Sequence, residues 1–220
     1  MTTALDQAEK YLKGESMLDS PGAVLYSSAT TLEKGPIYLL GLNPGGNESS
    51  TLQDSIDASR AGHNAYLDEQ WSPGGHLQPK GQATLQRRVQ KLCQSMGFNT
   101  RDVPASNLVF TRSTRLQMHL DYDLALRLCM PVHEIFLRSI QPRFVMTFGS
   151  LVNFSSSFRL ENLETKLAEH GNWKANRGNI DFDGRKISFG NVPHMSLWAS
   201  DKRQDVVNWA IAGLEKTNRL

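Results

Sequence analysis

Two short segments of the sequence carry side chains that can hold a ligand at the end of a strand. The first reads Gly41-Leu42-Asn43-Pro44-Gly45 and follows the apolar run 37–40, which is typical of a strand buried on both faces. Gly41 lets a ligand or another backbone come close, and Pro44 biases Asn43 toward an extended backbone. The pattern predicts that Asn43 is presented from the carboxyl end of a central strand, where open α/β sheets bind ligands. An ordinary Asn-Pro-Gly turn is the alternative interpretation.

The second segment follows the last apolar run of the chain, at 186–192. It reads His194-Met195-Ser196-Leu197-Trp198. A histidine at a strand end can donate a hydrogen bond to charge that develops on a substrate. A single loop histidine or tryptophan is more often structural. However, parallel strands end at one edge of a sheet, so Asn43, His194 and either Asn107 or Arg112 can meet in one cleft.

Strand-like and helix-like patterns alternate along the chain. Apolar runs predict strands at 37–40, 103–111, 143–149 and 186–192. Helical patterns cover 4–13, 82–96, 121–140, 150–158, 162–170 and 205–216, with a kink expected at Pro131. The alternation predicts an α/β fold in one domain, residues 1–220. We expect a three-layer α/β/α sandwich with a central, mainly parallel four-stranded sheet.

The composition is that of a globular protein, with 220 residues, 39% hydrophobic and 21% charged. No run approaches the roughly 20 apolar residues that a membrane span needs. The first six residues lack the basic region and apolar core of a secretory signal. Cys93 and Cys129 have no CxxC spacing, which argues against a zinc or iron–sulfur site and predicts reduced thiols in a cytoplasmic protein. We expect a monomer without metal, cofactor or membrane partner.

The charge is unevenly distributed, although the net value is only +2. Between Lys80 and Arg115 there are seven basic residues against Asp102 alone. Such a basic face can follow a phosphate backbone, which makes DNA a candidate partner. A solvated helix face is the commoner explanation of such a cluster.

These residues together resemble the uracil-DNA glycosylase superfamily. The segment at 41–45 is similar to the first motif of its mismatch-specific and single-strand-selective branches, which read Gly-hydrophobic-Asn-Pro-Gly. The segment at 194–198 is similar to the second motif, His-Pro-Ser-Pro followed by a hydrophobic wedge. In addition, 106–112 resembles the strand that carries the base-reading residue, and Phe148-Gly149 resembles the aromatic-Gly end of the third strand. The four anchors lie in order over residues 35 to 200.

The resemblance implies a monofunctional DNA glycosylase that flips out uracil or a C5-modified pyrimidine, hydrolyses its N-glycosidic bond and leaves an abasic site. Asn43 would position the attacking water, since an amide does not titrate, and His194 would stabilise charge on the departing base. The residues implied to contact the base are Gly41, Leu42, Pro44, Gly45, Tyr66 or Trp71 by stacking, and Asn107 at the Watson–Crick edge. The residues implied to contact DNA are Arg112, Arg115, Ser196 and a wedge of Leu197 and Trp198.

The sequence also departs from the family pattern. Met195 and Leu197 replace both prolines of the second motif. The uracil-only branch has Asp in place of Asn43 and a bulky Tyr in place of Gly45, and that Tyr blocks C5 substituents. The pocket is therefore expected to admit a C5-modified pyrimidine, including the bulky modified cytosines of some phage genomes, with repair and antiviral defence both open as purposes.

Two other classes of function stay open. One is a catalytically silent nucleic-acid-binding relative with the same fold. The other is an unrelated α/β hydrolase or nucleotide-binding protein, which is disfavoured because the chain has no GxSxG and no GxxxxGK[ST] motif.

Overall fold

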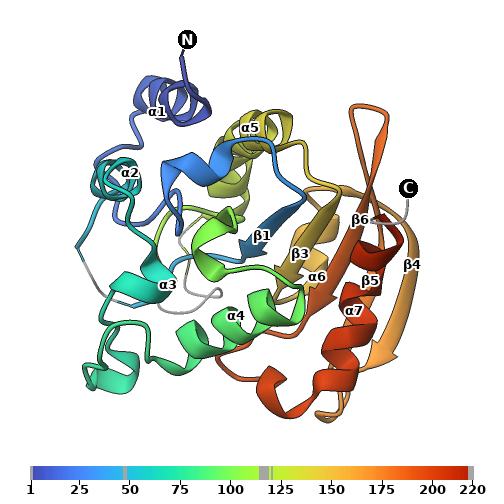
Figure 1. The fold of residues 1–220 in the computed structure, drawn as a ribbon. Helices are drawn as coiled ribbons and strands as arrows, with labels where there is room; N and C mark the ends of the chain where they lie inside the picture. Colours follow the sequence, from blue (N-terminus) through green and yellow to red (C-terminus); the bar gives the residue numbers. More distant parts are fainter. Residues whose placement is uncertain (1, 47–48, 114–118, 120, 218–220) are drawn as a thin grey trace.

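The computed structural model describes residues 2–46, 49–113, 119 and 121–217, with side chains as far as Leu214. These residues form a mixed α/β fold around one six-stranded, mostly parallel sheet (Figure 1). The strands are β1 (Ile37–Gly41), β2 (Ala105–Asn107), β3 (Phe144–Phe148), β4 (Arg159–Leu167), β5 (Lys174–Phe182) and β6 (Arg185–Val192). Their order is β2-β1-β3-β6-β5-β4. The four predicted strands all belong to the parallel part, although β2 covers only Ala105–Asn107 of the predicted 103–111. The prediction of a four-stranded sheet is wrong because β4 and β5 extend it.

Strand β1 lies inside the parallel part of the sheet, as predicted. It pairs with β2 on one side, where Gly41 lies opposite Asn107, and with β3 on the other. All five of its residues are buried. Its side chains alternate between the two faces, since Ile37 and Leu39 belong to one hydrophobic core and Tyr38 and Leu40 to the other.

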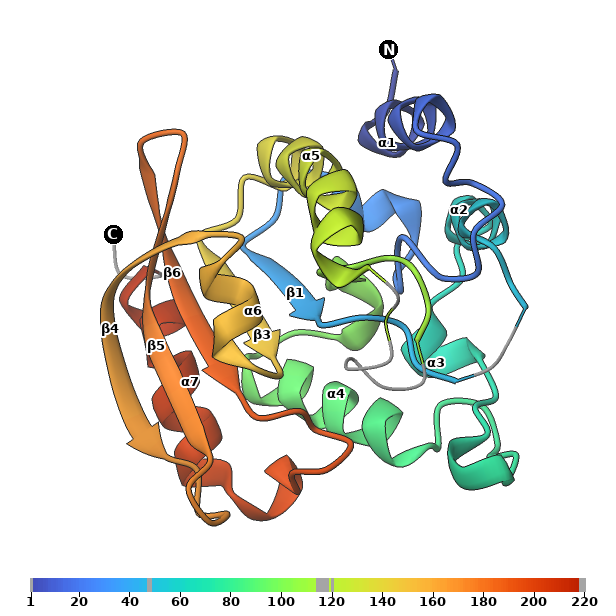
Figure 2. The same ribbon diagram turned by 180° about the vertical axis from the view of Figure 1, so that it is seen from behind.

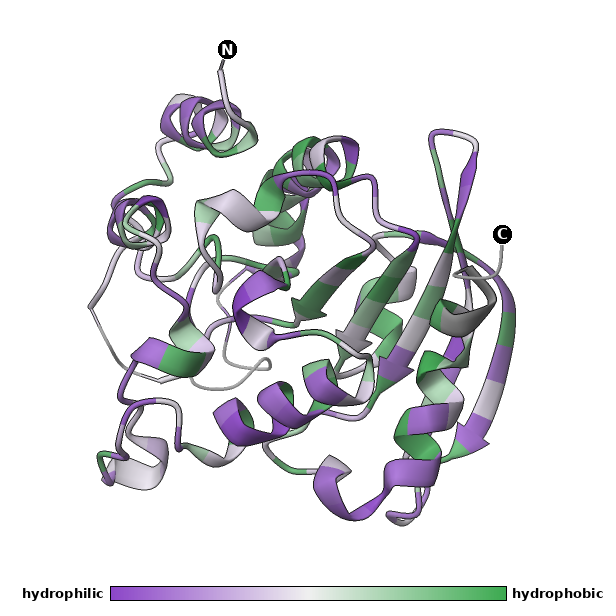
Figure 3. Cartoon of the chain, viewed as in Figure 1, coloured by the Kyte–Doolittle hydropathy of each residue, from purple (hydrophilic) through white to green (hydrophobic). Residues whose placement is uncertain are grey.

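Helices pack on both faces of the sheet. They are α1 (Ala4–Gly14), α2 (Leu52–Arg60), α3 (Ala65–Asp68), α4 (Thr84–Ser95), α5 (Tyr122–Ile140), α6 (Leu151–Ser155) and α7 (Gln204–Thr217). Helices α1, α2 and α5 share the core that contains Tyr38, and α4 and α7 share the core that contains Ile37. The residues of β1 and β3 are mainly apolar, and the outer side of α4 is mainly polar (Figure 3). The predicted helices at 4–13, 82–96, 121–140 and 205–216 are confirmed, and α5 runs through Pro131 as one helix.

The β4–β5 hairpin replaces the helix predicted at 162–170. It lies beyond β6 at the edge of the sheet (Figure 2), with β5 antiparallel to both β4 and β6. The pairing register shifts between Glu161 and Glu164, where Asn162 has a φ of 52°. Asp183 and Gly184 form the predicted turn between β5 and β6, with φ values of 51° and 74°.

Candidate functional site

The carboxyl ends of the four parallel strands open onto one large cavity, with a volume of about 1610 Å³. Asn43 follows β1, Asn107 ends β2, Phe148 ends β3 and His194 follows β6. All four residues line the cavity, and the argument from strand ends predicted the meeting of Asn43, His194 and Asn107. Residues far apart in the sequence therefore meet around one space that can hold a ligand.

The carboxamide of Asn43 is held in one orientation. Its Nδ2 donates hydrogen bonds to the carbonyl oxygens of Pro44, at 2.9 Å, and Ser113, at 3.2 Å. Carbonyl oxygens only accept, so the nitrogen must face them and Oδ1 must point away. Within the described part of the chain Oδ1 makes no hydrogen bond. Asn43 therefore offers a fixed acceptor at the cavity.

Gly41 makes room for the side chain of Asn107. A Cβ atom at Gly41 would lie 2.1 Å from Asn107 Oδ1 and 3.0 Å from the ring of Phe148. The Asn107 carboxamide is nearly buried and, among the described residues, makes no side-chain hydrogen bond. It keeps one donor and one acceptor available, which is what reading the edge of a base requires.

The loop after Asn43 leaves the cavity open at Gly45. A Cβ atom built there meets no atom within 4 Å. The Gly45 carbonyl accepts a hydrogen bond from Arg112 Nη1, and Arg112 Nη2 donates to Ser50 Oγ at 3.2 Å. Arg112 thus ties the loop to the segment before α2, and it also lines the cavity.

His194 is fixed in one tautomer by Ser196. The Ser196 amide N–H donates to His194 Nδ1 at 3.3 Å, and the Ser196 hydroxyl lies 2.7 Å from the same atom. A backbone donor requires Nδ1 to accept, so Nε2 carries the proton. Burial lowers the pKa of His194 below its ordinary value, and the Phe148 ring packs edge-on at 5.7 Å between centroids. His194 therefore offers a neutral N–H donor.

The rest of the His194 loop packs into the core. Met195 is buried, and its carbonyl accepts a 2.5 Å hydrogen bond from Arg88 Nη1 of α4. Trp198 is fully buried, and its indole N–H donates to the Ala168 carbonyl at 2.8 Å. The prediction that Trp198 belongs to an exposed wedge is therefore wrong. Leu197 lines the cavity with 70% of its surface exposed, so it is an apolar side chain available at the rim.

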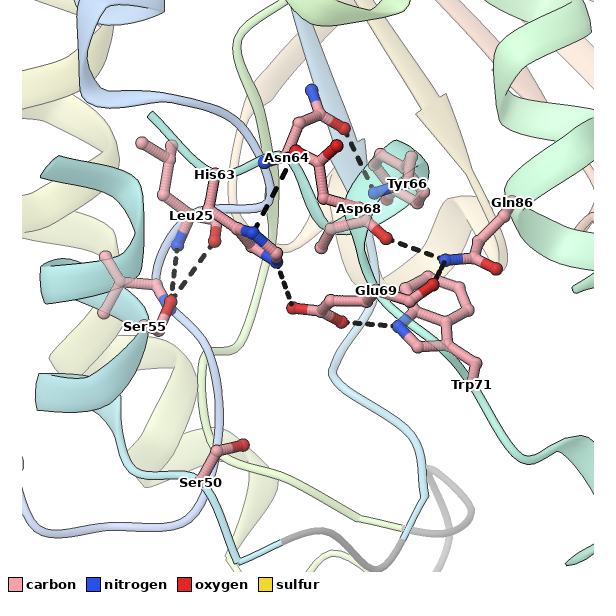
Figure 4. A network of polar contacts seen from close by, with 12 residues as sticks. Leu25, Ser50, Ser55, His63, Asn64, Tyr66, Asp68, Glu69, Trp71 and Gln86 are labelled. Carbon is pink, nitrogen blue, oxygen red and sulfur yellow. Dashed lines mark hydrogen bonds and ion pairs between the residues drawn. The ribbon is translucent and has the colours of Figure 1, made fainter. Parts of the chain in front are cut away.

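An aromatic wall closes another side of the cavity. Tyr66, on α3, is buried with its ring centroid 5.4 Å from Tyr26 and 5.8 Å from Trp71. The Trp71 indole N–H donates to Glu69 Oε2 at 2.5 Å, and His63 Nε2 lies 3.4 Å from Glu69 Oε1 (Figure 4). The wall thus combines stacking surfaces with a carboxylate that already accepts from Trp71 and lies beside His63.

The predicted site residues divide into three groups. Those that line the cavity are Leu42, Asn43, Gly45, Tyr66, Trp71, Asn107, Arg112, His194, Ser196 and Leu197. Gly41 and Pro44 support it without lining it, and Trp198 lies in the core. Arg115 lies outside the described residues.

Sequence reasoning missed other cavity residues, among them Tyr26, Trp173, Asn176 and Asn191. Asn176 donates to Asn191 at 3.1 Å, and Asn191 donates to Thr147 Oγ1 at 2.9 Å, so these buried amides satisfy each other across the sheet. Only the assignment of β5 as a strand would have placed Asn176 beside the cavity.

Among the described residues there is no site arranged for metal binding or for a reactive thiol. No group of three or more His, Cys, Asp or Glu side chains there is placed to hold a metal ion. Cys93 and Cys129 are buried and unpaired with each other, and burial raises the pKa of both thiols to about 12. In the same part of the chain no helix has the length and hydropathy to cross a membrane.

No protein-family model fits the sequence, and no curated protein is significantly similar to it. The chemistry of the cavity is therefore the ground for a functional assignment.

Proposed function

We propose that the protein is a monofunctional DNA glycosylase that hydrolyses the N-glycosidic bond of a flipped-out uracil or C5-modified pyrimidine and leaves an abasic site. One observation carries the proposal: a fixed amide acceptor at Asn43 and a neutral N–H donor at His194 line the same cavity, at the ends of parallel strands. The resemblance of both segments to the motifs of the uracil-DNA glycosylase superfamily supports it. The α/β/α layering of that superfamily agrees with helices packed on both faces of the sheet.

The proposed reaction uses each side chain for one task. Asn43 Oδ1 accepts a hydrogen bond from a water molecule and orients it, because an amide is too weak a base to remove its proton. The water oxygen bonds to C1′, the C1′–N bond breaks, and its electron pair leaves with the base. His194 Nε2–H donates to the carbonyl oxygen on which negative charge develops. The water's proton passes to the departing base or to solvent.

The choice of base follows from the shape of the cavity. Asn107 supplies one donor and one acceptor for the Watson–Crick edge, and the Tyr66 and Trp71 wall supplies a stacking surface. At Gly45 no side chain stands in the way of a C5 substituent. The cavity of about 1610 Å³ is much larger than a pyrimidine and leaves space for a bulky one. These features support modified pyrimidines, including modified phage cytosines, as substrates.

Mass spectrometry of released bases tests the proposal. The panel consists of DNA containing uracil, mismatched thymine or phage-type modified cytosine. We expect release of at least one base, and a fall in rate of about 10² to 10³ in both Asn43→Ala and His194→Ala. His76→Ala, an exposed histidine outside the cavity, is the matched control and should keep full activity.

Two results of this test would contradict the proposal. Full activity in Asn43→Ala and His194→Ala would remove both residues from the mechanism. Binding of DNA without release of any base would indicate the catalytically silent relative instead.

A further inference from the structure

The tip of the β4–β5 hairpin reaches the rim of the cavity. Asn172, Trp173 and Lys174 all line it. Large hydrophobic side chains are exposed at seven positions of the described residues, and of these only Trp173 and Leu197 also line the cavity. Trp173 is 38% exposed. An exposed indole on the rim of a binding cavity offers a flat apolar surface to whatever enters.

The position of Trp173 is fixed relative to His194. The hairpin closes on itself through the Ala168 N–H, which donates to the Trp173 carbonyl at 2.8 Å, and the indole packs edge-on against His170 at 4.7 Å. Residues after His194 anchor the hairpin from outside. Trp198 donates to the Ala168 carbonyl, and Arg203 Nε donates to the Glu169 carbonyl at 3.0 Å.

The chemistry around the tip suits a nucleic-acid strand. Trp173 is an exposed aromatic side chain, and the neighbouring Lys174 is an exposed basic residue. Aromatic faces bind bases by stacking regardless of sequence, and cations follow the phosphates. A base inside the cavity would lie among Asn43, Asn107 and His194, whereas Trp173 stands at the rim. The base nearest to Trp173 is then a neighbour of the reacting nucleotide along the strand.

We infer that Trp173 stacks on an unpaired base that flanks the flipped nucleotide, so the β4–β5 hairpin is a second point of contact with the DNA strand. This inference rests on the proposed function for its ligand. It assigns a role to a segment that shares no residue with the two motifs. It also gives Trp173 a task separate from that of Leu197, which enters the space left by the flipped nucleotide.

Fluorescence anisotropy with a labelled single-stranded oligonucleotide tests the inference without requiring turnover. The oligonucleotide carries the best substrate pyrimidine, or uracil, at its centre, and all proteins carry Asn43→Ala so that no base is released. We expect Trp173→Ala to raise the Kd roughly 10-fold and Trp173→Phe to restore most of the affinity. Leu167→Ala is the matched control, because Leu167 is 62% exposed on the same hairpin and does not line the cavity. Its Kd should not change.

A second oligonucleotide separates stacking from a general effect. It carries abasic residues on both sides of the central pyrimidine, so no flanking base is present. We expect the protein with Asn43→Ala alone to bind this oligonucleotide roughly 10-fold more weakly than the complete strand. The protein that also carries Trp173→Ala should bind both oligonucleotides with the same Kd. Equal losses from Trp173→Ala on both oligonucleotides, or an unchanged Kd on the complete strand, would overturn the inference.

The outcomes distinguish this inference from the proposed function. If the Asn43→Ala protein binds the strand but the unsubstituted protein releases no base from any substrate, the glycosylase assignment is wrong. The stacking role of Trp173 is then still decided by the comparison of the two oligonucleotides. An unchanged Kd in Trp173→Ala, with normal base release by the unsubstituted protein, would defeat the stacking role alone. Absence of any binding to DNA would defeat both.

Discussion

Asn43 and Gly45, two positions apart in the loop after β1, shape the cavity differently: one by a fixed side chain, the other by having none. Asn43 has a side chain whose orientation is set by two carbonyl acceptors, and Gly45 has no side chain in a place where one would meet open space. The loop thus presents a fixed acceptor beside an unobstructed opening. For the proposed reaction, the first property orients water and the second decides which bases enter.

Closing that opening should change the choice of base. Gly45→Tyr is expected to fold, because its Cβ meets no atom within 4 Å. The ring should exclude C5 substituents, since a steric wall discriminates where a permissive pocket gives only about 1–3 kcal/mol per methyl group. We expect kcat/KM for a C5-modified pyrimidine to fall at least about 10-fold more than kcat/KM for uracil, as measured by base release.

Gly45→Ala serves as the control and should process both substrates as before, because a single methyl group does not reach across the opening. If Gly45→Tyr also leaves both substrates unaffected, the base enters facing another wall, such as that of Tyr66 and Trp71. A wild-type protein that releases uracil and no C5-substituted base would directly contradict the proposal that the opening at Gly45 admits C5 substituents.

The placement of strand-end residues was predictable from the sequence, and the burial of Trp198 was not. Asn43 and His194 follow the apolar runs at 37–40 and 186–192, which places both at one sheet edge whatever the details of packing. Asn107 lies inside the predicted strand 103–111, and only the structure shows that β2 ends at this residue. Trp198 was assigned to the wedge by its place in a motif. Its burial depends on the Ala168 carbonyl, which belongs to a hairpin that the sequence pattern assigned to a helix.

At the scale of elements, the β4–β5 hairpin shows why the sheet was underestimated. Leu160, Leu163 and Leu167 recur at spacings of three and four, which is the periodicity of a helix. In the structure they lie on an edge strand that is mostly exposed, with a register shift between Glu161 and Glu164. Such strands lack the alternation of a half-buried strand, because little of either face is buried. The buried parallel strands were predicted correctly because both of their faces are buried, which gives continuous apolar runs in the sequence.

The loop after β6 divides its apolar residues between solvent and core, and this division gives a testable contrast. Leu197→Ala should lower base release from duplex DNA about 10-fold and leave single strands nearly unaffected, because a wedge offsets the cost of unstacking only in a duplex. Trp198→Ala should instead lower the free energy of unfolding by about 3–5 kcal/mol, the usual cost of truncating a buried aromatic side chain. Paired base-release assays and urea unfolding measure the two effects.

Equal losses on duplex and single strands in Leu197→Ala would point to a role in loop structure. A Trp198→Ala protein of unchanged stability would contradict the packing role of the indole. Val152→Ala is a control for both measurements, since Val152 is exposed and does not line the cavity.

At the scale of the whole molecule, the cations between Lys80 and Arg115 do not form one free basic face. Arg88 bonds to the Met195 carbonyl and lies 3.1 Å from Asp201, and Lys91 Nζ donates to the Asp201 carbonyl at 3.1 Å. Arg101 pairs with Asp68 at 2.9 Å, next to the aromatic wall. Several of these cations are therefore engaged in contacts within the protein. Charge counting along the sequence could not separate these structural partners from charges available to DNA.

Acid should destabilise the whole fold through His133, a buried histidine that does not itself line the cavity. His133 of α5 is fully buried, with Nδ1 2.9 Å from the Tyr38 hydroxyl and Nε2 3.0 Å from the Leu108 carbonyl. The carbonyl only accepts, so Nε2 carries the proton and Nδ1 accepts from Tyr38. Burial, which penalises the charged ring, lowers the pKa of His133 to about 4. The ring is thus neutral in the folded protein at pH 7.

The sign of the effect follows from proton uptake. Between about pH 6.5, the ordinary pKa of histidine, and about pH 4 the unfolded chain binds a proton that the folded chain does not. The free energy of unfolding therefore falls as the pH falls through this window, by roughly 3 kcal/mol in total from His133, and this contribution stops changing below it. His133→Gln, which can accept from Tyr38 and donate to Leu108 without titrating, should flatten the dependence. His76→Gln, at an exposed histidine, should keep it. Urea unfolding of the three proteins at pH 7.5 and pH 5 measures the difference, and parallel losses in all three would exclude His133 as the source.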